Sequence, residues 1–193
     1  MLPSAIKCDG CLVSYNFPDP SRGLYLYALN YDIKNQMVKD EDLVCIPKKP
    51  VWCGVCNSPT FAEDLRSIRD WEGAYSLIKV GESVEYPIPN GHLDDKGSVI
   101  PEFKTLFSIR QTRNERGRCL CCGGLQYADI GSPETGLIHE ECGGKFYRQY
   151  SIHSCLYKTS AYKVYSKDGF QIGRLKQHSD IEGVMLVNEC GYE

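Results

Sequence analysis

The feature that most constrains this chain is a pair of short cysteine motifs with one shared pattern. One reads C-x-x-C-G-G from Cys119 to Gly124, and the other reads H-x-x-C-G-G from His139 to Gly144. Each can form a tight turn that directs two ligands at one point, because glycine adopts the positive φ that such a turn needs. Three cysteines and one histidine at this separation form a tetrahedral set that zinc favours. The predicted ligands of this zinc ion are Cys119, Cys122, His139 and Cys142.

One ligand in that set has a rival. Cys121 could bind in place of Cys122, because C-x-C pairs also hold metals. We prefer Cys122, since only it reproduces the spacing of the H-x-x-C-G-G motif. The alternative to a metal site here is a group of buried or free thiols beside a solvated histidine.

Two further C-x-x-C motifs lie upstream, at Cys8–Cys11 and Cys53–Cys56. Each is incomplete alone, and together they form a four-cysteine set that predicts a second zinc ion. The segment between them exceeds the usual separation, so a hairpin of Leu24–Tyr31 and Val44–Ile46 should bring the two motifs together. The alternative is a single zinc ion elsewhere and two loose thiol pairs here. A redox function fits less well, because no βαβ pattern surrounds either pair. The predicted ligands of the second zinc ion are Cys8, Cys11, Cys53 and Cys56.

The eleven cysteines also indicate a compartment. The first residues lack the apolar stretch of a signal peptide, and no run is long enough to cross a membrane. An odd number of cysteines, most of them in short pairs, favours metal in a reducing compartment over disulfides. We therefore expect a cytoplasmic protein without a membrane partner. Four residues stay unassigned, with a ligand exchange open for the first two: His153, Cys155, Cys45 and Cys190.

Hydrophobic periodicity predicts two helices. Thr60 and Glu63 fit a capping box, and apolar residues follow at helical spacing, so we expect a helix over 61–77. Residues 81–101 are rich in glycine and proline and are expected to form a loop. A second helix is expected over 102–116.

Strand signals occupy the rest of the chain. The segments 125–130 and 137–138 are expected to form a hairpin with the metal at its base. Further along, 160–165 and 170–173 flank an Asp-Gly pair, which is a strong hairpin signal, and 184–187 is expected to be a last strand. The fold class is therefore α+β, with small zinc-ribbon or treble-clef-like modules, β-hairpins and two helices.

These elements divide the chain into three successive parts. Residues 1–80 are expected to form an N-terminal zinc module with its helix. Residues 81–117 form a loop excursion and a basic helix. Residues 118–193 form a C-terminal zinc ribbon with a β-hairpin tail.

A local basic cluster stands out against the net charge of −3. That charge argues against a dedicated nucleic-acid binder, which is usually basic, but a local face leaves such binding open. Arginines three residues apart can line one side of the second helix. The first interpretation is a solvated face with cations at a helix C-terminus, and the alternative is a contact to phosphate or to an acidic partner. The cluster comprises Arg110, Arg113, Arg116, Arg118, Lys145 and Arg148.

Enzymatic interpretations fit poorly. The stretch from His139 to Glu141 satisfies the H-x-E of zinc deaminases, but their P-C-x-x-C should follow it, and here the C-x-x-C precedes it without the proline. A catalytic zinc also needs an open coordination position, whereas the predicted set is full. No phosphate loop or dinucleotide fingerprint occurs in the sequence. We predict that the protein is not an enzyme.

Four stretches carry a resemblance to known proteins. They are W-C-G-V-C-N at 52–57, R-C-L-C-C-G at 118–123, I-H-E-E-C-G-G-K at 138–145 and V-Y-S-K-D-G at 164–169. In this order they resemble a group of uncharacterised bacterial zinc-ribbon proteins, which implies zinc and a bacterial cytoplasm. More distantly, the chain is similar to paired-C-x-x-C immunity proteins of contact-dependent toxin systems, which have two zinc knuckle sets and a strand-rich end.

Two functions remain open. The first is a zinc-stabilised, non-enzymatic protein that binds an unknown protein partner, such as a bacterial immunity or adaptor protein. The acidic charge, the many tyrosines and the closed metal sites fit it, since tyrosine is enriched at interfaces. The second is a nucleic-acid-binding zinc ribbon that uses the basic cluster. Steep salt dependence of binding would distinguish the second from the first.

Overall fold

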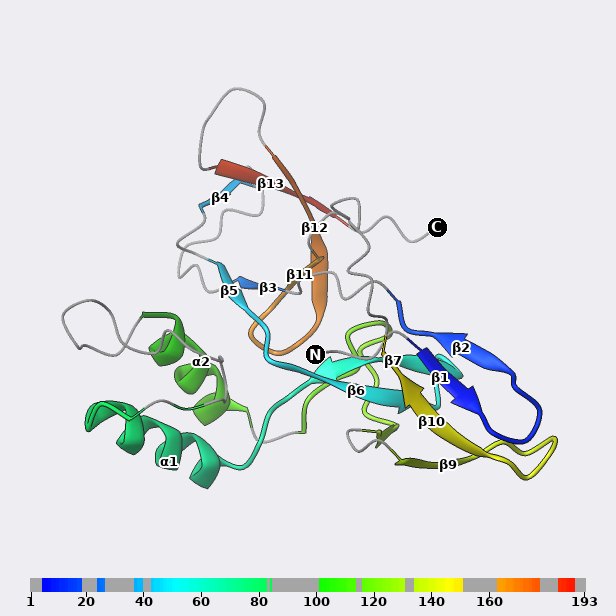
Figure 1. The fold of residues 1–193 in the computed structure, drawn as a ribbon. Coiled ribbons are helices and arrows are strands. Elements are labelled where there is room, and N and C mark those ends of the chain that lie inside the picture. Colours follow the sequence, from blue (N-terminus) through cyan, green and yellow to red (C-terminus); the bar gives the residue numbers. More distant parts are fainter. Residues whose placement is uncertain are drawn as a thin grey trace. The chain divides into compact units, whose positions relative to one another are not determined.

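The computed structural model describes residues 5–18, 24–26, 37–39, 43–82, 84, 101–113, 116–130, 134–150, 163–177 and 184–189. The chain divides into two compact units, each assembled from three separate segments (Figure 1). Unit 1 takes Met1–Arg22, Lys48–Glu63 and Arg118–Ala161, and unit 2 takes Gly23–Pro47, Asp64–Gly117 and Tyr162–Glu193. This division differs from the three successive parts expected from the sequence (1–80, 81–117 and 118–193), because strands far apart in the chain pair with each other.

Unit 1 contains two small antiparallel sheets. Its strands are β1 (Ala5–Cys8), β2 (Ser14–Asn16), β6 (Lys48–Cys53), β7 (Ser58–Glu63), β8 (Tyr127–Asp129), β9 (Glu134–Ile138) and β10 (Lys145–Gln149). One sheet has the order β2-β1-β10-β9, and the other has the order β7-β6-β8. The register of β1 against β10 places Cys8 opposite Phe146, so the N-terminal segment lies beside a strand from the C-terminal half.

Aromatic side chains join the two sheets of unit 1. Tyr15 from β2 meets Trp52 from β6 edge to face, with ring centroids 5.5 Å apart. Phe146 from β10 contacts both rings. Phe17 lies 5.3 Å from Phe61 of β7. Such aromatic pairs each add about 0.5–1.5 kcal/mol beyond the burial of their area, so they fix one sheet against the other.

The hairpin expected from 125–130 and 137–138 does not form. In the structure β8 pairs with β6, with Tyr127 opposite Cys53, and β9 pairs with β10, with Ile138 opposite Lys145. The two segments therefore belong to different sheets. The strand character of both segments is confirmed, and their pairing is wrong.

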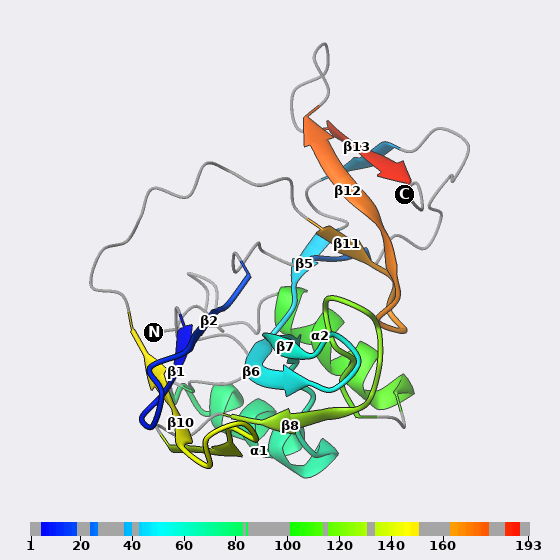
Figure 2. The same ribbon diagram turned by 90° about the vertical axis from the view of Figure 1, so that its right-hand side faces the viewer.

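Unit 2 contains a six-stranded sheet and two helices (Figure 2). Its elements are β3 (Leu24–Leu26), β4 (Met37–Lys39), β5 (Leu43–Cys45), α1 (Ile68–Lys79), α2 (Pro101–Thr112), β11 (Lys163–Tyr165), β12 (Gln171–Gln177) and β13 (Val184–Glu189). The sheet order is β4-β13-β12-β11-β3-β5, and only the pair β11–β3 is parallel among the paired strands described. The expected hairpin around the Asp-Gly pair is confirmed by β11 and β12, with Gly169 at φ 80°.

The two helices of unit 2 pack through aromatic rings. Trp71 and Tyr75 of α1 each contact Phe103 and Phe107 of α2, with centroids 5.7–6.3 Å apart. Trp71 and Phe103 are fully buried. The apolar stripe expected on the first helix is therefore part of a core, as the spacing indicates.

The first helix begins later than the sequence pattern predicts. Residues Ser58–Glu63 form β7, and every one of them pairs with β6, from Ser58 opposite Cys53 to Glu63 opposite Lys48. The expected capping box at Thr60 is therefore wrong. The box that forms uses Ser67, whose hydroxyl accepts from the N–H of Asp70, while the Asp70 carboxylate accepts from the N–H of Ser67. The second helix ends at Thr112, short of the expected Arg116.

The α+β class is confirmed by these sheets and helices. Among the described residues, neither helix has the length and apolar character that a membrane crossing requires.

Candidate metal centres

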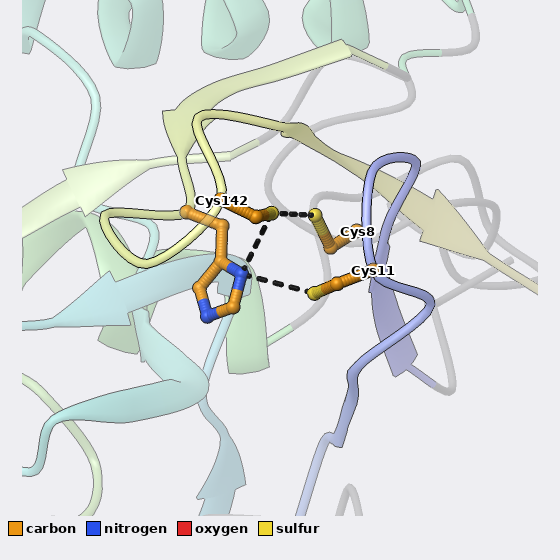
Figure 3. A group of neighbouring side chains, drawn as sticks. Cys8, Cys11 and Cys142 are labelled. Carbon is orange, nitrogen blue, oxygen red and sulfur yellow. Dashed lines mark hydrogen bonds between the residues drawn. The ribbon is translucent and has the colours of Figure 1, made fainter.

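The first candidate centre, the outer cluster, joins the two ends of unit 1. It comprises Cys8, Cys11, His139 and Cys142. Figure 3 shows the thiols of Cys8, Cys11 and Cys142 directed toward one another. The sulfur atoms of Cys8 and Cys142 are 3.4 Å apart, and His139 Nδ1 lies 3.2 Å from the sulfurs of both Cys11 and Cys142.

Sheet register positions the outer cluster. Cys8 is the last residue of β1, and His139 and Cys142 lie in the turn between β9 and β10. Two hydrogen bonds hold the two turns together: the N–H of Asp9 donates to the backbone carbonyl of Lys145, and the N–H of Lys145 donates to the Asp9 side-chain carboxylate. A Cβ on Gly144 would lie 2.6 Å from the Cys8 sulfur, so only glycine fits there.

The second candidate centre, the inner cluster, consists of four cysteines. They are Cys53, Cys56, Cys119 and Cys122. The sulfur atoms of Cys53 and Cys122 are 3.6 Å apart, and those of Cys56 and Cys119 are 4.0 Å apart. Cys53 and Cys119 are fully buried.

Contacts at the end of β7 bring the inner cluster together. Cys53 is the last residue of β6, and Cys56 lies in the turn between β6 and β7. The segment that carries Cys119 returns beside β7, where Ala62 and Cys119 form a β-bridge. Next to this bridge, the buried Glu63 accepts the N–H of Arg118 at 2.7 Å and donates its own N–H to the Arg118 carbonyl. Glu63, which the sequence pattern predicted to cap a helix, instead positions the start of the turn that carries Cys119 and Cys122.

All four turns that supply ligands share one backbone feature. The residue directly after the second ligand of each turn has a positive φ, between 46° and 72°. These residues are Leu12, Asn57, Gly123 and Gly143. The two glycine turns match further, because the N–H of Cys119 and of His139 each donate to the carbonyl of the second glycine. The same local structure is therefore repeated at both centres, as the repeated glycine pattern indicates.

The donor separations fit a tetrahedral metal ion. Zn–S bonds of about 2.3 Å place two sulfur ligands about 3.8 Å apart around the ion. The donor atoms of each cluster all lie within 4.8 Å of one another. Four donors from cysteine and histidine complete a tetrahedral shell, so each cluster could hold one metal ion, without an open coordination position.

The ionisation of the thiols also favours a cation. Burial raises the pKa of Cys8, but N–H groups of its own turn outweigh burial and lower it to about 7. Burial likewise opposes ionisation of Cys53, and backbone N–H donation again lowers its pKa. In the opposite direction, burial raises the pKa of Cys119 to about 12. At Cys142 the N–H of Gly144 favours the thiolate, but neighbouring thiols and burial raise the pKa to about 11. Only a bound cation stabilises all the thiolates of one cluster together.

The imidazole of His139 lies between the thiols of the outer cluster and the carboxylate of Glu141. Its Nδ1 faces the thiols, and its Nε2 lies 3.7 Å from the carboxylate of Glu141. Metal-binding histidines commonly direct their other ring nitrogen at a carboxylate, which orients the ring and raises its basicity. The Glu141 side chain is 87% exposed, so this effect is weak.

The eight predicted ligands are all brought into clusters, but the predicted pairing is wrong. The sequence analysis joined Cys8 and Cys11 to Cys53 and Cys56, and it joined the two glycine motifs to each other. In the structure each cluster takes one C-x-x-C turn that no double glycine follows and one turn that ends in the double glycine. The repeated C-G-G pattern therefore marks equivalent halves of two centres, which is the signal that could have given the correct pairing.

Other predicted residues have mixed outcomes. Cys121 stays outside the four-ligand inner cluster, which agrees with the choice of Cys122. Cys45 is an exposed residue of β5. His153, Cys155 and Cys190 lie outside the described residues.

The arginines of the basic cluster mainly donate to backbone carbonyls. Arg110 donates to the carbonyls of Arg66 and Arg113. Arg113 is buried and donates to the carbonyl of Lys167, and Arg118 donates to that of Gly123. The expectation that Arg113 lies on a solvated helix face is therefore wrong.

No protein-family model, curated protein or solved structure matches the chain. The fold and the clusters alone define its class. It is an α+β protein with two cysteine-rich groups that could bind two metal ions.

Proposed function

We propose that this chain is a zinc-stabilised, non-enzymatic protein that binds another protein through the turns around its two metal centres. Both ions are zinc and structural in this proposal, because each donor set is complete and contains only the soft and borderline ligands that zinc prefers. So many free thiols favour a reducing bacterial cytoplasm. An immunity or adaptor protein fits this description.

The observation that carries the proposal is the exposure of large apolar side chains beside the ligands. Leu12 follows the ligand Cys11 and is 64% exposed, and Ile138 precedes the ligand His139 and is also 64% exposed. Leu12 has a φ of 62°, which is costly for a residue with a Cβ. The backbone of Leu12 belongs to the turn that carries Cys8 and Cys11, but its side chain stays exposed where a small or polar residue would serve the turn as well, and this supports a role in binding.

The charge around these two side chains indicates the partner. Glu140 and Glu141 lie in the same turn as His139 and are exposed. The complementary partner is therefore a protein surface or segment that combines apolar and basic side chains. Charge of this kind raises association rates, whereas the buried apolar contacts supply affinity.

Enzymatic activity finds little support at these centres. Four protein donors leave no position for a substrate or an activated water. An open hollow beside α1, lined by residues that include Arg66, Arg69 and Leu77, contains none of the eight candidate ligands.

The test compares two exposed apolar sites in one chain. The double variant Leu12→Asn with Ile138→Thr removes the proposed contact, and Val80→Asn removes an even more exposed side chain at the end of α1. Partners captured from the native cell by the parent protein are identified by mass spectrometry, and their affinity is then measured with all three proteins. Burying one such side chain contributes about 1.5–3 kcal/mol. The double variant should therefore bind at least about tenfold more weakly.

Two controls make that comparison decisive. Both variants should retain the metal content of the parent, which excludes unfolding as the cause. Equal affinity of the double variant and the parent would remove the proposed surface, and so would equal losses in both variants.

Nucleic-acid binding remains the second candidate, and Lys145 is the residue that favours it. Lys145 is exposed at the start of β10, whereas Arg148 is only half exposed and lies over the ring of Tyr150. The arginines Arg110 and Arg113 already donate to carbonyls, which weakens the phosphate-binding interpretation. We expect no binding of RNA or single-stranded DNA at low salt. If binding occurs with a steep salt dependence that Lys145→Ala reduces by about one unit of slope, the second function replaces the first.

A further inference from the structure

The open hollow beside α1 has a volume of about 400 Å³ and is formed by residues of unit 2 alone. Its lining from the helix includes Arg69, Gly73 and Leu77. These residues are spaced four apart, so they lie along one face of α1. Trp71 points away from this face and packs on Phe103 of α2. The hollow therefore lies outside the aromatic core that joins the two helices.

The chain that leaves α1 bounds the other side of the hollow. The N–H groups of Gly81 and Glu82 donate to the carbonyls of Ile78 and Leu77, respectively. This is the hydrogen-bond pattern of a Schellman turn, and Gly81 has the positive φ that the turn requires, at 84°. The turn directs the chain back toward the helix, where Val84 lines the hollow together with Leu77. Two segments of the chain therefore enclose the space.

Gly73 keeps the middle of the hollow empty. A Cβ at Gly73 would meet no atom of the described residues within 4 Å, and Gly73 is not among the glycines with a positive φ. Neither the backbone conformation nor the packing of the described residues therefore requires glycine at this position. Glycine is less favourable inside a helix than any residue except proline. The space that it leaves beside α1 accounts for its presence.

Two arginines give the hollow a positive charge. Arg69 is exposed and forms no hydrogen bond or ion pair with the described residues. Arg66 lies 3.5 Å from the carboxylate of Asp64, but its side chain is 52% exposed, and such a surface pair contributes little. The carboxylate of Asp70, which also lines the hollow, accepts from the N–H and the hydroxyl of Ser67 and so belongs to the helix cap. The charge that is available to a ligand is therefore positive.

We propose that this hollow is a binding site for a small organic anion, with a carboxylate or sulfonate group and an apolar body. The acidic group binds Arg69 and Arg66, because guanidinium groups donate charge-assisted hydrogen bonds to such oxygens. The apolar body lies over Gly73, against Leu77 and Val84. Small-molecule sites have volumes of about 300–1,000 Å³, so this hollow takes a ligand of roughly one or two rings. The site does not depend on the metal centres, whose ligands all belong to unit 1.

The experiment uses two fluorescent probes that share an apolar body and differ in charge. Anilinonaphthalenesulfonate carries a sulfonate group, and phenylnaphthylamine lacks it. Each probe is titrated with the full chain, as purified with its metal, and with four variants. Fluorescence that arises at other apolar surfaces is common to all five proteins, so the differences between them report on the hollow.

Two variants change the hollow, and each has a matched control on the same helix. Gly73→Leu fills the space with a residue that favours helix. Its control is Ser76→Leu, which adds the same side chain at an exposed position outside the lining. Arg69→Gln removes a cation of the hollow. Its control is Lys79→Gln, which removes an exposed cation in the last turn of α1.

The parent should bind the sulfonate probe at least about threefold more tightly than the uncharged probe, which is the size expected of an exposed ion pair. Gly73→Leu should lose the saturable binding of both probes, with a melting temperature no lower than that of the parent. Arg69→Gln should weaken the sulfonate probe by about threefold and leave the uncharged probe unchanged. Both controls should bind as the parent does.

Three outcomes would overturn the proposal. They are the absence of saturable binding by the parent, equal affinity of the parent for the two probes, and equal binding of the sulfonate probe by the parent and Gly73→Leu. If Gly73→Leu fails to fold, Arg69→Gln decides in its place, and an unchanged affinity of that variant for the sulfonate probe would also overturn the proposal.

Discussion

Double substitutions can reveal which cysteine turns share a metal ion. The structure places Cys8 with Cys142 in the outer cluster and Cys53 in the inner cluster. Cys8→Ser with Cys142→Ser should therefore remove one metal ion, because both substitutions damage the same centre. Cys8→Ser with Cys53→Ser should remove two, because each substitution damages a different centre. The pairing expected from sequence spacing gives the reverse result.

The energies involved make the difference easy to detect. Structural zinc contributes on the order of 10–16 kcal/mol of apparent binding free energy, and a domain is stable by about 5–15 kcal/mol. One lost ion should destabilise unit 1 severely, and two lost ions should leave unit 1 unfolded. Metal content is therefore measured on protein expressed at low temperature and is supported by the single variants.

The nested arrangement adds a smaller, directional effect. Cys11 and His139 are 128 residues apart, and Cys53 and Cys122, which lie between them, are 69 residues apart. Once the inner centre has formed, the loop that the outer centre must close is about half as long, which lowers its closure cost by about 0.6 kcal/mol. Loop closure alone therefore predicts that loss of the inner ion weakens the outer site by roughly threefold.

The assay is elemental analysis of each variant after purification without added metal. The parent should contain two equivalents, each single variant one, the first double variant one and the second double variant none. The pairing that the structure shows would be refuted by the reverse result. In that case the variant with Cys8→Ser and Cys142→Ser would lose two equivalents, and the variant with Cys8→Ser and Cys53→Ser would lose one.

Three further results are expected. Leu12→Asn should raise the free energy of unfolding by about 0.5–1 kcal/mol in urea titrations, because asparagine tolerates a positive φ better than leucine does. Asn57 already adopts a positive φ at the matching position of the inner cluster. An unchanged free energy of unfolding would argue against backbone strain at Leu12. Ser67→Ala should lower the stability of unit 2 by about 1 kcal/mol, with no loss of metal, because it removes the cap of α1; a lost zinc equivalent would contradict this assignment. Zinc affinity should fall as the pH is lowered from about 8 to about 6, because the ion displaces protons from thiols of high pKa such as Cys119 and Cys142. The affinity is measured by competition with a chelator at each pH, and an affinity that does not change with pH would contradict this reasoning.

Local sequence patterns predicted the metal-binding turns but not their partners. The spacing of two cysteine or histidine residues and the residue that follows them determine a turn, and all eight residues of the two clusters were identified in this way. The choice of partner depends on the register of strands far apart in the chain, such as β1 against β10. That register rests on contacts such as Trp52 with Phe146, which no local pattern encodes.

The start of α1 shows a second limit. Two possible capping boxes lie close together, one at Thr60 and one at Ser67, and both have an acidic residue three positions later. The first lies in a segment whose side chains are buried and whose backbone pairs with β6. Tertiary pairing therefore overrides the local signal at Thr60 and leaves Ser67 as the cap.

The segment Asp64–Gly117 of unit 2 interrupts unit 1 between β7 and the turn that contains Cys119. The two ends of this interruption are held beside each other within unit 1, because Glu63 and Arg118 exchange backbone hydrogen bonds and the Glu63 carboxylate accepts the Arg118 N–H. The inner cluster lies directly after this contact, so a bound metal ion would reinforce the same closure. Since closure cost rises only slowly with loop length, a pair of ends fixed in this way tolerates a long inserted segment. The nested order of the two clusters therefore accounts for how unit 1 can be assembled from three separate segments of the chain.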